Sequence, residues 1–90
     1  MMDVEQHTIA TLDAMSDILE EYNRAISLHG PMNSAHEGYA VLLEEVDELW
    51  DVVKMKQSQR DMKEMRKEAI QVAAMALKFI VQICETDNRK

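Results

Sequence analysis

The stretch EAIQVAAMALKFIVQIC, residues 68–84, decides the fold of this chain. Apolar residues fill most of its positions, and its Ala, Met and Leu residues favour helix over strand. Such a helix is apolar on nearly all sides, so it has to be buried among other elements. We therefore expect an all-α protein built on a helix from about residue 61 to about Glu85, with residues 86–90 as a frayed polar tail.

Two amphipathic helices are expected before this central helix. Residues 4–28 carry apolar residues at three- and four-residue spacing, which predicts a long first helix with one buried stripe. The stripe comprises Ile9, Leu12, Met15, Ile18, Leu19, Tyr22 and Ile26. The opposite, solvated side comprises Asp13, Asp17, Glu20, Glu21 and Arg24.

Helix ends are marked by residues that cap or interrupt helices. His29-Gly30-Pro31 ends the first helix, with Gly30 suited to a left-handed position after the last turn. Ser34 and Glu37 have the spacing of a capping box, which predicts a second helix from about residue 35 to about Lys56. Asp61 and Glu64 repeat this spacing at the start of the central helix. The second and central helices then form an antiparallel pair.

The composition describes one small domain spanning 1–90, with a formal net charge of -7. This charge argues against nucleic acid or an anionic membrane as the main partner, because both need a basic face. No stretch has the length and apolar content of a membrane span, and the first residues lack the basic and apolar segments of a secretory signal. Cys84 is the only cysteine and fits a small core residue in a reducing compartment. We expect a cytoplasmic protein.

Carboxylates occupy apolar faces of two helices. In the run Glu44-Glu45-Val46-Asp47-Glu48, helical geometry places Glu45 on the same face as Leu49 and Val52, with Glu48 beside it one turn along. Glu68 falls between Met75 and Phe79 on the central helix. Glu44, Asp47 and Asp51 lie on the opposite side of this helix.

An ionised carboxylate in apolar surroundings costs several kcal/mol, so it must be paired, protonated or bound to a metal. Carboxylates one turn apart on one helix, facing another from a second helix, make an oxygen-rich nest that Mg²⁺ or Mn²⁺ prefers. The alternative is a solvated acidic face on residues 44–51, with Glu68 a first-turn acid that the helix dipole favours. Both interpretations stay open at this point.

Residues 44–49 and 68–71 together resemble the motif of MazG-like nucleotide pyrophosphohydrolases. Glu44-Glu45-Val46-Asp47-Glu48-Leu49 resembles the E-E-x-x-E half of that motif, and Glu68-Ala69-Ile70-Gln71 resembles the E-x-x-D half about 20 residues later. The resemblance extends from about His29 to Val81 and includes the segment Asn33 to Tyr39. Gln71 departs from the pattern, because the family usually has Asp there, and an amide oxygen brings no charge to a metal.

The resemblance implies Mg²⁺-dependent hydrolysis of a nucleoside triphosphate between its α and β phosphates. Glu45, Glu48 and Glu68 are then the metal ligands, with Gln71 as a weak or outer ligand. Glu44 is the expected orienter or base for the attacking water. Lys54 and Lys78 are expected either as phosphate contacts or as ordinary surface charges.

Two neighbouring helices with one stripe each cannot cover the whole central helix, so its remaining face is expected against another subunit. The resemblance implies a homodimer with a four-helix-bundle core, with a tetramer as a further possibility. Two other functions remain open. One is a catalytically weak nucleotide- or metal-binding regulator of the same fold, and the other is a purely structural helical dimer.

Overall fold

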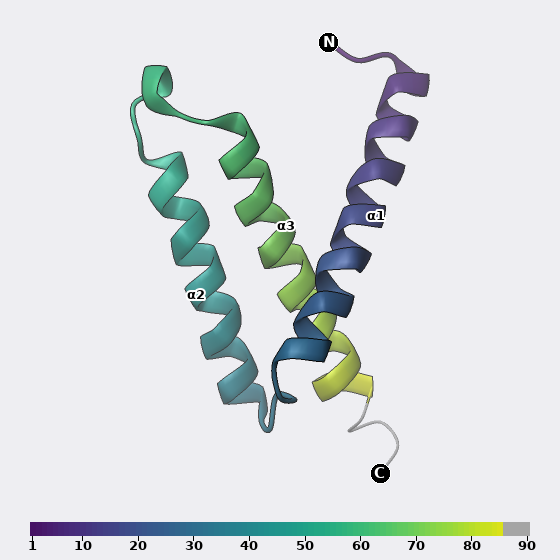
Figure 1. The fold of residues 1–90 in the computed structure, drawn as a ribbon, viewed down its shortest axis with the longest axis vertical. Helices are drawn as coiled ribbons and strands as arrows, with labels where there is room; N and C mark the ends of the chain where they lie inside the picture. Colours follow the sequence, from purple (N-terminus) through teal and green to yellow (C-terminus); the bar gives the residue numbers. More distant parts are fainter. Residues whose placement is uncertain (86–90) are drawn as a thin grey trace.

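Residues 1–85 fold into three α-helices, as expected for an all-α protein (Figure 1). The structure, a computed structural model, describes residues 1–85, so the expected tail at 86–90 lies outside the described residues. The helices are α1 (Val4–Leu28), α2 (Ala35–Val53) and α3 (Met62–Phe79). A short 3-10 turn, η1 (Gln57–Gln59), precedes α3, and a π-helical turn, η2 (Ile80–Cys84), extends it.

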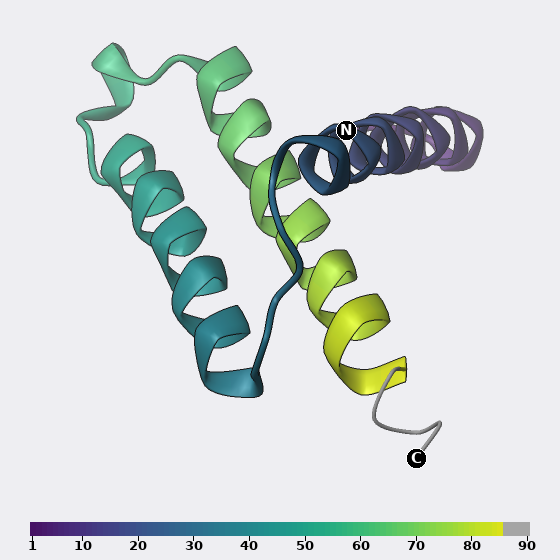
Figure 2. The same ribbon diagram turned by 60° about the horizontal axis from the view of Figure 1, so that its bottom comes forward.

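Helix α3 is the central element, because it packs against both α1 and α2. Helices α2 and α3 run antiparallel (Figures 1 and 2). Helix α1 packs against α3 with the C-terminal half of α1, so the first turns of α1 stand apart from the other helices. The radius of gyration is 15.1 Å, whereas a compact chain of this length has about 12 Å. Within residues 1–85 we find no helix with the length and apolar content needed to cross a membrane.

All three helices begin at side-chain caps. The Asp61 carboxylate accepts hydrogen bonds from the backbone N–H groups of Lys63 and Glu64, and Ser34 Oγ accepts from Glu37 N at 3.1 Å. Asp3 forms a complete capping box with Gln6 at the start of α1. These contacts confirm the two starts that the sequence predicts at Ser34 and Asp61, because each cap satisfies an N–H group that the helix leaves unpaired.

The helix ends differ from three expectations. The chain leaves α1 through His29 in an extended conformation, and Gly30 is not left-handed, since no described residue has a positive φ. Helix α2 was expected to run to about Lys56 but ends at Val53. The N–H of the next residue, Lys54, donates to two carbonyls of the last turn. The last turn of the central helix widens into η2 instead of continuing as α-helix.

The connector between α1 and α2, residues 29–34, is fastened by side chains of the central helix. Lys78 Nζ donates to the Gly30 carbonyl at 3.0 Å, and Met32 N donates to Gln82 Oε1 at 2.9 Å. Both contacts span about 50 residues of sequence. The His29 N–H still bonds to the Ala25 carbonyl at the end of α1, while Gly30 and Met32 are held by side chains of α3 and η2.

The core of the protomer is small. Its buried apolar residues are Ala25, Met32, Val52, Ala74 and Met75. Half-buried Val41, Leu42, Phe79 and Ile83 pack against this cluster. No large side chain of residues 1–85 is less than 2% exposed, and Cys84, expected in the core, is exposed.

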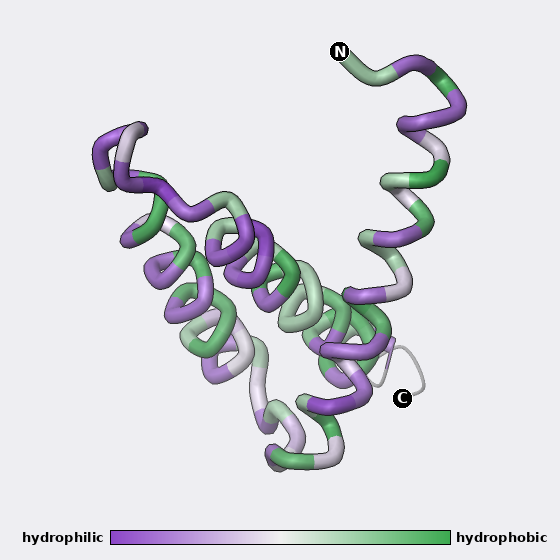
Figure 3. The backbone as a smooth tube through the Cα atoms, turned by 45° about the horizontal axis from the view of Figure 1, so that its top comes forward, coloured by the Kyte–Doolittle hydropathy of each residue, from purple (hydrophilic) through white to green (hydrophobic). Residues whose placement is uncertain are grey.

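The apolar stripe expected to bury α1 instead faces outward along most of its length. Ile9, Leu12, Met15, Leu19 and Ile26 are each between 40% and 60% exposed. The side of α1 that faces α3 is less exposed. Its residues are half-buried or buried and comprise Ala14, Asp17, Ile18, Glu21, Tyr22 and Ala25. In Figure 3, hydrophobic segments appear along the part of α1 that stands apart from the other helices.

An ion pair between α1 and α3 accompanies this orientation, since Arg66 Nη2 lies 2.8 Å from Asp17 Oδ2. Asp17 and Glu21 were both expected on the solvated side of α1. Asp17 faces α3 through this ion pair, and its side chain stays 45% exposed. The Glu21 side chain is only 18% exposed, so the expectation was wrong for Glu21.

Gly38 allows α2 and α3 to approach closely. A Cβ atom at this buried position would lie 2.7 Å from Phe79 Cδ2 and 3.1 Å from Met32 Sδ. Both distances are shorter than ordinary van der Waals contact, so a larger residue would push the phenyl ring out of its place in the core.

We expect Gly38→Ala to lower the free energy of unfolding by about 1–3 kcal/mol, because overpacking at Phe79 outweighs the gain in helix propensity of about 1 kcal/mol. Gly30→Ala is the matched control, since nothing lies within 4 Å of a Cβ atom at Gly30. Urea denaturation of both variants measures the difference. Equal stability of the two would show that Phe79 yields without strain.

Candidate functional site

Three carboxylates from two helices meet between α2 and α3. One oxygen from each of Glu45, Glu48 and Glu68 lies within 4.8 Å of the other two. Glu45 and Glu48 are one turn apart on α2, and Glu68 comes from the second turn of α3. Antiparallel packing places the middle of α2 beside the first half of α3, which brings the three together.

Two carboxylate oxygens of this group are buried without a partner. Glu45 Oε2 and Glu68 Oε2 are shielded from solvent and have no hydrogen-bond partner among the described residues. Both residues are half-buried, whereas Glu48 is exposed. Buried oxygens of this kind normally accept a hydrogen bond or bind a cation.

Burial and mutual repulsion make these carboxyls harder to ionise. Burial is the main cause that raises the pKa of Glu45 to about 7, followed by the charge and hydrogen bonding of Glu48 and the charges of Glu68 and Glu21. Burial also raises the pKa of Glu68, together with the charge of Glu48 and the nearby Glu64 carboxyl. The group therefore favours either a proton or a metal cation near neutral pH.

The donor set fits a hard divalent cation. Three carboxylate oxygens are the ligand type that Mg²⁺ and Mn²⁺ prefer. All three oxygens lie within 4.8 Å of one another, which is close to the about 4.2 Å between oxygens on opposite sides of Mg²⁺.

A pocket of about 330 Å³ adjoins the carboxylate group and shares Glu45 with it. Its walls come from the C-terminal end of α1, the connector, α2 and α3. Ala25, Met32, Val41 and Met75 supply apolar surface, and Glu44, Gln71 and Lys78 supply polar groups. Its size lies at the lower end of the range for small-molecule pockets, about 300–1,000 Å³.

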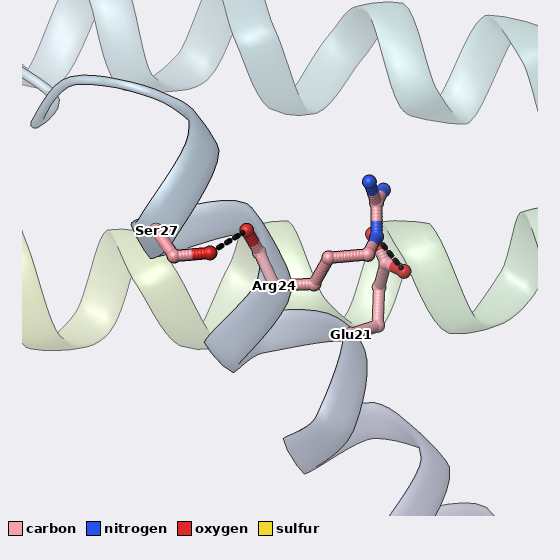
Figure 4. Close-up of polar contacts among 3 residues, drawn as sticks. All are labelled: Glu21, Arg24 and Ser27. Carbon is pink, nitrogen blue, oxygen red and sulfur yellow. Dashed lines mark hydrogen bonds and ion pairs between the residues drawn. The ribbon is translucent and has the colours of Figure 1, made fainter.

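Arg24 and Glu21 form the α1 side of this pocket (Figure 4). The guanidinium donates through Nε to Glu21 Oε1 at 2.9 Å and through Nη2 to Glu21 Oε2 at 2.7 Å. This hydrogen bond lowers the pKa of Glu21, against the opposing effect of burial. Arg24 therefore lines the same pocket as Glu44 and Glu45, with its charge paired to Glu21.

The structure brings together some of the expected site residues and separates others. Glu45, Glu48 and Glu68 meet as expected. Glu44 is exposed and lines the pocket beside Glu45, and half-buried Gln71 lines the same pocket.

The two lysines differ. Lys78 is 4% exposed and lines the pocket, so the expectation of a surface charge was wrong for it. Lys54 is exposed, lies 3.0 Å from Asp51 and does not line the pocket.

Sequence reasoning missed Glu21, Arg24 and Glu64. Glu64 lies one turn before Glu68 on α3, and its carboxyl raises the pKa of Glu68. The turn-to-turn spacing of Glu64 and Glu68 signals that proximity in the sequence. No such signal exists for Glu21 and Arg24, because α1 presents a different face to α3 than its apolar stripe predicts.

Comparisons with models of known families, with curated proteins and with solved structures found no match to this chain.

The raised pKa of Glu45 predicts how metal-free stability depends on pH. Because the folded value is about 7 and the ordinary value 4.5, the stability linked to this proton is fully present below about pH 4.5. It is lost as the pH rises through about 7. We expect a loss of about 1–2 kcal/mol, less than the full shift gives because solvent screens the group.

Urea denaturation in EDTA between pH 4.5 and 8 measures this loss. Glu45→Gln, which cannot ionise, should flatten the profile over this range. Asp47→Asn, a change at an exposed acid of the same helix, should leave the slope unchanged. Identical slopes for wild type and Glu45→Gln would contradict the assignment.

Proposed function

We propose that this protein is a Mg²⁺-dependent nucleoside triphosphate pyrophosphohydrolase, with Mn²⁺ as an alternative ion. It would cleave a nucleotide, or its deoxy form, between the α and β phosphates to give the monophosphate and pyrophosphate. The observation that carries the proposal is the meeting of Glu45, Glu48 and Glu68, with two of their oxygens buried and unpaired. The motif resemblance to MazG-like enzymes at these same residues supplies the reaction.

Charge supports a role for metal in binding substrate. The chain has a net charge of -7, and acids surround the site, so a polyphosphate would be repelled without added cations. When bound, Mg²⁺ neutralises carboxylates, contacts phosphate oxygens and makes water more acidic. Glu45, Glu48 and Glu68 would hold the ion in the space between α2 and α3.

The position of Glu44 supports a role in activating water. It lies next to Glu45 in the chain, is exposed and lines the pocket wall. We assign it the role of orienting or deprotonating the water that attacks the phosphate. Lys54 is less suited to contact phosphate than the sequence indicates, because it is paired with Asp51.

The exposed apolar faces support a homodimer, or a tetramer built from it. Along α1 the exposed residues are Ile9, Leu12, Met15, Leu19 and Ile26, and along α2 they are Tyr39, Leu43, Val46 and Trp50. The small core and the large radius of gyration indicate that one protomer leaves much of its apolar surface uncovered. A second copy covering these faces would complete a helical bundle.

A catalytically weak regulator of the same fold is the second candidate. It is favoured by Gln71, which stands at the position where the resembled motif has Asp. Such a protein would bind Mg²⁺ and nucleotide at the same site without turnover, so binding and hydrolysis need separate measurements.

Mg²⁺ binding and pyrophosphate release test the proposal directly. We expect isothermal titration to detect Mg²⁺ or Mn²⁺ binding, and at least one nucleotide of a canonical and deoxy panel to release pyrophosphate. Glu45→Gln and Glu68→Gln should each lower metal affinity and activity by at least about tenfold, because each removes a charged ligand.

Asp47→Asn is the matched control, since it removes one charge from the exposed side of the same helix. It should keep metal affinity within about twofold of wild type. Absence of metal binding at millimolar concentration would reject the site. Metal and nucleotide binding without any turnover would instead favour the regulator.

If the exposed apolar residues of α1 hold the dimer or tetramer together, charges placed among them should lower the mass of the particle in solution. We expect wild type to sediment as a dimer or tetramer, and the double variant Leu12→Glu with Met15→Glu to shift toward the monomer, because charges replace apolar contacts. Ala10→Glu, an exposed position off this face, is the control and should not dissociate the assembly. A monomeric wild type would overturn the assembly.

A further inference from the structure

Gln71 carries an amide at the wall of the pocket. Gln71 is half-buried and lines the pocket beside Glu45. Its side chain makes none of the side-chain hydrogen bonds found among residues 1–85. Gln82, on the same helix, instead accepts a hydrogen bond from Met32 N. The amide atoms of Gln71 are not among the fully buried polar atoms of residues 1–85, so they are open to water or to a ligand in the pocket.

Lys78 is a second incompletely paired group in the same pocket. It is 4% exposed, and its ammonium donates to the Gly30 carbonyl at 3.0 Å. It forms none of the ion pairs found among residues 1–85. Because an ammonium has three N–H donors, two remain to serve groups inside the pocket.

These residues lie in a row along α3. Glu68, Gln71, Met75 and Lys78 follow one another at three- and four-residue spacing, so they share one face of the helix. The row starts at the carboxylate group and ends at the connector, about 15 Å further on. A ligand whose phosphates are held at Glu68 would therefore extend its other end past Gln71 toward Lys78.

We propose that Gln71 is a base-reading residue rather than a metal ligand. In this arrangement its amide hydrogen-bonds the edge of the nucleobase, and Lys78 donates to an acceptor of the same base. The inference rests on the proposed nucleotide-binding function.

The chemistry of the pocket fits a nucleobase. An amide offers an adjacent donor and acceptor, which pairs with the donor and acceptor pattern on a base edge. Met75, Met32 and Val41 offer apolar surface for a flat heterocycle. Gln71 thus selects among bases, while the carboxylates hold the part that all nucleotides share.

Equilibrium binding with a base-free control separates this role from metal ligation. The probes are Mg²⁺ alone, inorganic tripolyphosphate with Mg²⁺, and α,β-methylene analogues of the four nucleoside triphosphates, which resist cleavage at that bond. We expect Gln71→Met, which keeps the size of the side chain but loses the amide, to weaken the preferred nucleotide about tenfold. The affinities for Mg²⁺ and tripolyphosphate should stay within about twofold.

Two further variants sharpen the test. Gln71→Glu keeps an acceptor and loses the donor of the side chain. For each of the four nucleotides, the affinity is divided by the affinity for tripolyphosphate, which removes the effect of the added charge on metal binding. We expect the order of the four bases in this ratio to differ from that of wild type. Gln59→Met, at an exposed glutamine of η1, is the matched control and should change none of these affinities.

Two results would overturn the inference while leaving the proposed function standing. One is a loss of Mg²⁺ affinity in Gln71→Met as large as that in Glu68→Gln, which would make Gln71 a metal ligand. The other is unchanged nucleotide affinity and unchanged base ranking. If wild type binds neither Mg²⁺ nor any nucleotide, the proposed function fails and the inference fails with it.

Discussion

The packing of α2 on α3 holds carboxylates of both helices together against their own repulsion. Each pair of ionised groups at about 5 Å repels by roughly 1–3 kcal/mol, and burial adds to the cost. Apolar contacts of Val52, Ala74 and Met75 offset it. The contact of Gly38 with Phe79 sets how closely the helices approach. The same packing thus stabilises the fold and creates the need for a cation.

Helix α3 combines two roles that usually fall to different elements. Its residues Ala74 and Met75 belong to the core. The polar row from Glu68 on α3 to Gln82 on η2 supplies a carboxylate, a free amide and the two side chains that fasten the connector. These roles are compatible because Lys78 and Gln82 bond to backbone groups that the extended connector leaves unpaired. The pocket exists because the connector is drawn onto α3 at this end.

The elements and the carboxylate group could be predicted from the sequence because both depend on local periodicity. Ser34 and Asp61 mark their helix starts by capping, and Glu45 and Glu68 stand out as acids on apolar faces. The orientation of α1 could not be predicted in this way. Periodicity identifies an apolar stripe but not what covers it, and here Asp17 and Glu21 turn toward α3 while Leu12 and Met15 face outward. Lys78 was misjudged for a related reason, since its partner is a backbone carbonyl far away in the chain.

The π-helical turn at Ile80–Cys84 has a consequence for the alignment of the polar row. A π turn contains about one residue more than an α turn, so each residue in it rotates less about the axis. Gln82 consequently lies almost directly in line with Lys78, where both side chains reach the connector. Deleting one residue between Lys78 and Gln82 would restore regular α-helix and place Gln82 three residues after Lys78, about 60° away from it around the helix axis. Chain length at this turn, and not only residue identity, therefore fixes how the pocket is closed.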